Sequence, residues 1–140
     1  MARDPFLQVY DILNDDEDLA NLLNGMRQTI QEDENFIFTH SIREEYRKYE
    51  FAPMIRMTPI AMLEKIWNDN DSQIYELVFS VEVFTTSITH GFDISTYIIN
   101  KYKREHNCVM INQNSQYDEL SDLYNSFMRY KIYINKGEIL

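Results

Sequence analysis

The sequence is poor in residues that interrupt regular structure and in residues that cross-link secreted proteins. Three glycines and three prolines stand among 140 residues, and the single cysteine, Cys108, allows neither an intrachain disulfide nor a multi-thiolate zinc site. The apolar runs are far shorter than the roughly 20 residues that cross a bilayer. The first residues, 1–5, show no signal-peptide pattern. We therefore expect a protein without a membrane span that is made and kept in a cytoplasm.

The composition is that of one folded domain. Hydrophobic residues make up 44% of the chain and aromatic residues 14%, and the length is close to the commonest length of a single domain. Thirteen basic residues against 23 acidic ones give a formal net charge of −10. Such a charge repels phosphate backbones and anionic lipids, so nonspecific nucleic-acid binding is disfavoured. We predict a single domain spanning 1–140.

Helical periodicity occurs three times. Apolar residues recur at helical spacing from Phe6 to Leu13, directly after a cap at Asp4 and a proline at the first helical position. The acidic run 15–18 precedes a second apolar stripe, where carboxylates favour the positive end of a helix. Ser87 can cap a third helix that ends in basic residues near His106. The sequence thus predicts two N-terminal helices and one later helix.

Strand patterns fill most of the remaining chain. The clearest is 75–83, in which apolar and polar residues alternate, and it leads into the third helix as a strand-to-helix crossover. Four further strands are predicted at 36–39, 54–58, 108–111 and 126–134, with 54–58 at an edge because prolines flank it and with the last strand closing the sheet. Three segments are read otherwise: 43–50 as a loop or an arm, 60–67 as a helix-like insert, and 112–125 as a polar excursion. The predicted fold class is α+β, a mostly antiparallel sheet of four or five strands with N-terminal helices and one helix packed across it.

No group of residues has the pattern of a catalytic or metal site. The histidines His40, His90 and His106 lie in three different predicted elements, without a second ligand at helical spacing. The acidic run 68–72 lacks the glycine and the final glutamate of a calcium loop. Cys108 has a histidine two residues away but no third orienting group. We expect no enzyme activity, no cofactor and no metal.

Aromatic residues are abundant, with ten tyrosines, eight phenylalanines and one tryptophan. Those on apolar faces are expected to pack the core, whereas tyrosines in polar stretches suit surfaces that are buried on assembly. Two arginines, which alternate with apolar neighbours on predicted strands, are candidates for salt bridges between subunits. The candidate interface residues are Tyr46, Tyr49, Arg56, Trp67, Asp69, Asp71, Tyr117, Tyr124 and Arg129.

Four segments, taken in order, resemble the tail terminator proteins of long-tailed bacteriophages, also called tail completion or head–tail joining proteins. They are the opening DPFLQVY at 4–10, APMIR at 52–56, the strand 77–85 that ends in VEVFT before a helix, and the closing DLYNSFMRYK at 122–131. The resemblance covers most of the chain, and no single segment is diagnostic. The stretch 43–50 and the insert 60–67 depart from the family pattern.

The resemblance implies a structural virion protein without catalytic residues. Such a protein forms a hexameric ring at the head-proximal end of the tail, stops polymerisation of the tail tube and presents the surface that docks to the head. Its partners are further copies of itself, the tail tube protein and a head–tail connector or stopper protein. DNA passes through the lumen without specific binding, and assembly takes place in the host cytoplasm.

Two other functions fit the sequence. A neighbouring head–tail connector or minor tail protein shares the same context and differs in its place in the assembly. An acidic monomeric inhibitor or immunity-type protein, which neutralises a basic partner by charge complementarity, belongs to another class and predicts a monomer with one dense acidic face.

Overall fold

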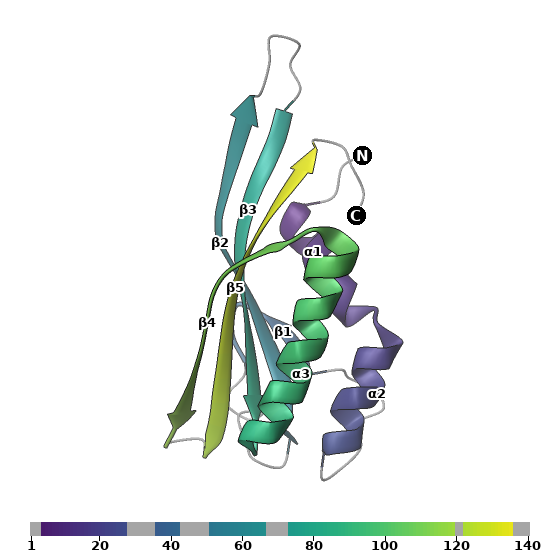
Figure 1. Ribbon diagram of the computed structural model, residues 1–140, viewed down its shortest axis with the longest axis vertical. Coiled ribbons are helices and arrows are strands. Elements are labelled where there is room, and N and C mark those ends of the chain that lie inside the picture. The colour runs from purple at the N-terminus through teal and green to yellow at the C-terminus, as the bar shows by residue number, and fades with distance from the viewer. Residues whose placement is uncertain (1–3, 28–35, 43–50, 67–72, 120–121, 136–140) are drawn as a thin grey trace.

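The computed structural model describes residues 4–27, 36–42, 51–66, 73–119 and 122–135. Three helices lie against one face of a five-stranded sheet (Figure 1). The elements are α1 (Pro5–Asn14), α2 (Glu17–Met26), β1 (Ile37–Thr39), β2 (Met54–Ile66), β3 (Gln73–Thr85), α3 (Ile88–Asn100), the π-helical turn η3 (Lys101–Glu105), β4 (Val109–Asp118) and β5 (Leu123–Asn135). The predicted α+β class is confirmed.

The strand order is β1-β2-β3-β5-β4. Only the β1–β2 pair is parallel, and the other three pairs are antiparallel. After β3 the chain passes along one face of the sheet through α3 and enters β4, and β5 lies between these two strands. This is the predicted strand-to-helix crossover. The last strand, however, is an inner strand and does not close the sheet.

Local sequence explains where the helices begin. Asp4 caps α1 by accepting a hydrogen bond from the Phe6 amide at 2.8 Å, and Asp16 caps α2 through the Asp18 amide at 3.0 Å. The Ser87 hydroxyl accepts from the His90 amide at 3.1 Å at the start of α3. Each cap satisfies an amide that has no partner inside its helix.

The main core lies between the helices and the sheet. Alternate residues of β3, from Leu77 to Val83, are buried there. The fully buried Tyr102 donates a hydrogen bond to the Val9 carbonyl at 2.7 Å, and its ring lies 5.3 Å from that of Phe79 and 5.1 Å from that of Tyr130. This tyrosine therefore connects η3, which follows α3, to α1 and to two strands.

Three strand predictions need correction. The insert from Ile60 onward is not helical, because it continues β2 to Ile66 and pairs with β3. The polar excursion is not a loop in its described part, because 112–118 belongs to β4 and β5 already begins at Leu123. Finally, β2 is covered by β1 at Ile55–Met57 and forms a sheet edge only beyond that contact. In each case, the conformation is determined by pairing with a neighbouring strand, which the local pattern of apolar residues does not reveal.

Candidate interaction surface

The second face of the sheet carries no helix of the described chain (Figure 1). Strand alternation places the predicted interface residues Arg56 and Arg129 on it. Arg56 on β2 lies opposite Glu82 on β3, and the two side chains form an ion pair with a hydrogen bond. The Arg56 guanidinium also lies over the ring of Phe84, 5.5 Å from its centroid. The charge of Arg56 is thus already balanced within the chain, and its contact with another subunit remains a prediction.

Tyr117 and Tyr124 lie opposite each other where β4 ends and β5 begins. Their ring centroids are 5.1 Å apart. Tyr117 is 47% exposed and donates a hydrogen bond from its hydroxyl to Asp122. That hydrogen bond to a carboxylate raises the pKa of Tyr117 to about 12. The sequence predicted both tyrosines on a loop, whereas the structure presents them from the rigid end of a strand pair.

Arg129 lies further along β5, opposite Ser80. Its guanidinium is 5.7 Å from the centroid of the Phe127 ring. Its buried Nε has no hydrogen-bond partner among the residues that the structure describes. The aromatic contact holds the guanidinium against the sheet.

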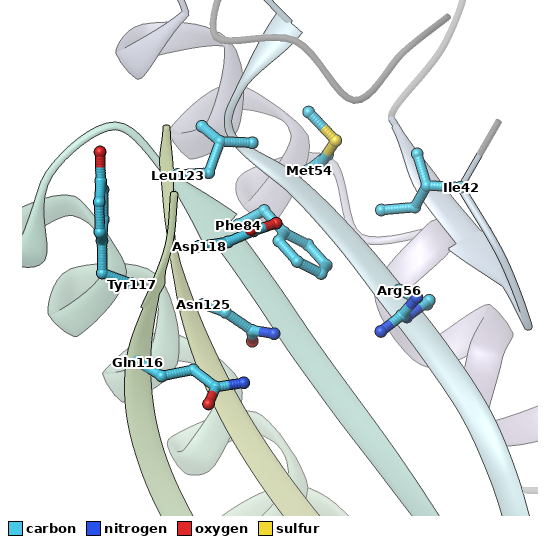
Figure 2. Close-up of a pocket in the computed structure, with 9 residues that line it drawn as sticks. All are labelled: Ile42, Met54, Arg56, Phe84, Gln116, Tyr117, Asp118, Leu123 and Asn125. Atoms are coloured by element: carbon cyan, nitrogen blue, oxygen red, sulfur yellow. The ribbon is translucent and has the colours of Figure 1, made fainter. Parts of the chain in front are cut away.

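A pocket of about 320 Å³ opens on this face near the ends of β4 and β5 (Figure 2). Two of the predicted interface residues, Arg56 and Tyr117, belong to its lining. Figure 2 shows that the Tyr117 ring points away from the other lining side chains. Tyr124 and Arg129 do not line it. Tyr124 pairs with Thr85, whose hydroxyl faces Gly91 of α3, so Tyr124 lies on the side of the sheet that the helices cover. The full lining is Ile42, Met54, Arg56, Phe84, Gln116, Tyr117, Asp118, Leu123 and Asn125.

Five predicted residues lie outside the described part of the chain: Tyr46, Tyr49, Trp67, Asp69 and Asp71. The same is true of the proposed loop or arm at 43–50.

The apolar wall of the pocket was not predicted. It belongs to a second cluster in which Phe36 and Phe51 stack with centroids 5.6 Å apart. Arg27, after the end of α2, supports this cluster: it lies 4.8 Å from the Phe36 ring centroid and donates a hydrogen bond to the Pro53 carbonyl at 2.8 Å. The signal in the sequence was a set of four phenylalanines: Phe36, Phe38, Phe51 and Phe84. The short strand predicted at 36–39 contains only two of them, so a second apolar cluster was needed to bury the set. The buried members are Phe36, Ile42, Ala52, Met54 and Leu123, with Phe38, Phe51 and Phe84 packed against them.

The chemistry of the described residues suits binding. No group of three histidine, cysteine, aspartate or glutamate residues among them could hold a metal ion. Burial raises the pKa of the Cys108 thiol to about 12, so this thiol is neutral and unreactive at ordinary pH. Burial also lowers the pKa of His106. A pocket with apolar walls and amide and carboxylate groups at its rim can accept a side chain of a partner protein.

Neither a protein family nor a curated protein matches the sequence. Among solved structures, the fold is similar to that of a chain in the structure described as the virion of a native gene transfer agent particle. The TM-score is 0.56, the sequence identity 12%, and the alignment covers 92% of this chain and 94% of the other. The two chains therefore share one fold over nearly their whole lengths.

Separately, no helix in the described part of the chain is long and apolar enough to cross a membrane.

Proposed function

We propose that this chain is a structural protein of a phage-like virion. The observation that carries the proposal is the shared fold with a chain of a gene transfer agent virion, which extends over 92% of this chain and 94% of that one. Because the alignment covers nearly all of both chains, the whole domain is compared and not a common fragment. The sequence segments that resemble tail terminator proteins support the same class of protein independently.

Within the virion, the proposed role is that of the tail terminator. Copies of the chain form a ring, taken as a hexamer, that caps the tail tube, ends its polymerisation and provides the docking surface for the head. The tail tube protein and a head–tail connector are the expected partners. A net charge of −10 weakens contact with DNA that passes through the ring, so the genome moves without specific binding.

The surface described above suits this role. Arg56 lies in a pocket on a face of the sheet that the described helices leave uncovered, and the pair formed by Tyr117 and Tyr124 lies where β4 ends and β5 begins. Surfaces built on strands keep their geometry when a partner binds, which lowers the entropy cost of association. The predicted contacts at Tyr46, Tyr49, Trp67, Asp69 and Asp71 remain proposals for the same assembly.

Removal of the gene from the particle genome tests the proposal. Loss of a terminator leaves tails of irregular, excessive length and heads without tails, and expression of the chain in trans restores tails of uniform length. Tails of normal length that fail to join heads would instead favour a neighbouring connector protein. Normal, joined particles would contradict a structural virion role.

A further inference from the structure

The two edges of the sheet carry an unusual share of the exposed apolar surface. Ten large hydrophobic side chains of the described chain are exposed. Six of the ten lie on the two outermost long strands, three on β2 and three on β4. They are Ile60, Met62 and Leu63 on β2 and Val109, Ile111 and Tyr117 on β4.

The β4 edge has few of the features that keep edge strands apart. Its sequence, VMINQNSQYD, has one charged residue in ten and no proline, although charged residues make up 26% of the chain. Almost every residue of β4 is exposed, and within the described chain β4 pairs only with β5. Proteins that remain monomers usually protect such an edge with charge, proline or a covering segment, since its free amides and carbonyls accept another strand.

The opposite side of the sheet offers a free edge of similar length. β1 pairs with β2 only at Ile55–Met57, and β2 continues from Thr58 to Ile66 with no outer partner among the described strands. Each edge contains one bulge, between Pro59 and Ala61 on β2 and between Met110 and Asn112 on β4. The regular runs that follow the bulges, 61–66 and 112–118, are nearly equal in length.

From these features we infer that β4 of one copy pairs with the free part of β2 of the next copy, so that neighbouring subunits share a continuous sheet. The partner of an edge strand must itself be an extended strand. Among the described strands, β4 has one unpaired edge and the part of β2 beyond β1 has another. Pairing of two different edges is heterologous, so it adds copies in one direction and closes when the rotation permits a ring. The inference rests on the proposed function only in taking a second copy as the partner.

Two single substitutions test the pairing in the full-length protein. Asn114→Lys places a charge in the middle of the β4 edge, and Met62→Lys does so on the β2 edge. Each is expected to weaken self-association by at least about tenfold, the effect of losing one or two net hydrogen bonds. Thr96→Lys, at an exposed position on α3, adds the same charge away from both edges and is the matched control. Circular dichroism shows whether each variant is folded.

A mixture of the two edge variants gives the sharper result. The Asn114→Lys copy keeps an intact β2 edge and the Met62→Lys copy keeps an intact β4 edge, so the mixture forms dimers with one good junction. Light scattering should show these dimers, and neither variant alone should form them at the same concentration. If only Asn114→Lys prevents assembly, β4 does not pair with β2 and the inference is wrong. Wild-type assembly by both variants, or no self-association of the wild type, also overturns it.

Hydrogen exchange separates this inference from the proposed function. In assembled protein the amides of 112–117 and 61–63 should exchange more slowly than in dilute monomer. Slow exchange at both edges in the monomer would show that another part of the same chain covers them, which overturns the inference. If the protein joins virions while these amides stay unprotected, the virion role stands and the edge pairing fails. If the edges pair but the protein never joins virions, the edge pairing stands and the virion role fails.

Discussion

At the scale of single residues, Asp16 connects α2 to α3. Its side chain is only 6% exposed, caps α2, accepts a hydrogen bond from the Tyr97 hydroxyl at 2.5 Å and lies 3.6 Å from the Lys101 ammonium. One carboxylate thus joins the start of α2 to the far end of α3.

Replacement of Asp16 by alanine should lower the free energy of unfolding by about 1–3 kcal/mol, because a cap and a charged hydrogen bond are lost together. The matched control is Asp15→Ala, since Asp15 is exposed and carries the same charge. It should change stability by less than about 0.5 kcal/mol. Urea denaturation of the three proteins provides the comparison, and equal stability of the two variants would contradict the account.

Tyr97 makes stability sensitive to alkaline pH. Burial, followed by the hydrogen bond to Asp16, raises the pKa of Tyr97 well above its usual range. The unfolded chain loses this proton near pH 10, whereas the folded protein keeps it, so deprotonation favours unfolding. The contribution of Tyr97 is complete below pH 10 and is lost as the pH rises toward the folded pKa.

Denaturation curves at pH 8 and at pH 11 should therefore show a loss of stability that is smaller in Tyr97→Phe than in the wild type. An identical loss in both proteins would mean that Tyr97 ionises equally easily in the folded and unfolded chains.

At the scale of elements, the first turn of α3 packs closely against the sheet. A Cβ atom at Gly91 would lie 2.9 Å from the Ser126 Oγ and 3.1 Å from the Thr85 Oγ1. The Thr85 hydroxyl is itself held by a hydrogen bond to the Ser87 carbonyl at 2.8 Å. A larger residue at 91 must therefore displace α3 or rotate both hydroxyls.

Gly91→Ala should destabilise the protein even though alanine favours helices. Gly25 in α2 is the matched control, because a Cβ there meets nothing within 4 Å. Gly25→Ala should be neutral or should stabilise by up to about 1 kcal/mol. Thermal melting gives the sign of each change, and stabilisation by Gly91→Ala would show that the helix–sheet contact is looser than described.

The elements also show what local sequence can predict. Strict alternation identified β3, and caps with apolar stripes identified α1, α2 and α3, because these signals act within one element. The start of β4 was predicted at 108–111, but its continuation to Asp118 was missed because its side chains are exposed on both faces and form no buried stripe. The end of β2 was misread as helical because Ile60 and Leu63 are three residues apart, while its long antiparallel pairing with β3 determines the structure.

The candidate surface was predictable only in part. Arg56, Tyr117 and Tyr124 were chosen because arginines on strands and tyrosines in polar stretches suit interfaces. The structure places Arg56 and Tyr117 in the lining of one pocket and Tyr124 against Tyr117. Which of these residues lie near one another depends on the order of the strands in the sheet, and the residue pattern within one strand does not reveal that order. The apolar wall around Met54 and Leu123 joins segments about 70 residues apart in sequence, so no local pattern could reveal it.

At the scale of the whole molecule, the two faces of the sheet differ in how the described chain covers them. One face is covered by the helices and holds the main core. The other face and the sheet edges carry paired charges, a pocket and exposed apolar side chains. The core under the helices stabilises the domain, so the other face and the sheet edges can bind partners without loss of that core.

We propose that copies of this chain assemble at the end of a virion tail. The most direct measurement is the mass of the purified protein by light scattering over a range of concentrations, with electron microscopy of the protein alone and mixed with tail tubes. The account predicts rings, either free in solution or formed on tube ends, with a mass that is a whole multiple of 16.9 kDa. A protein that stays monomeric at every concentration and leaves tube ends bare would contradict it.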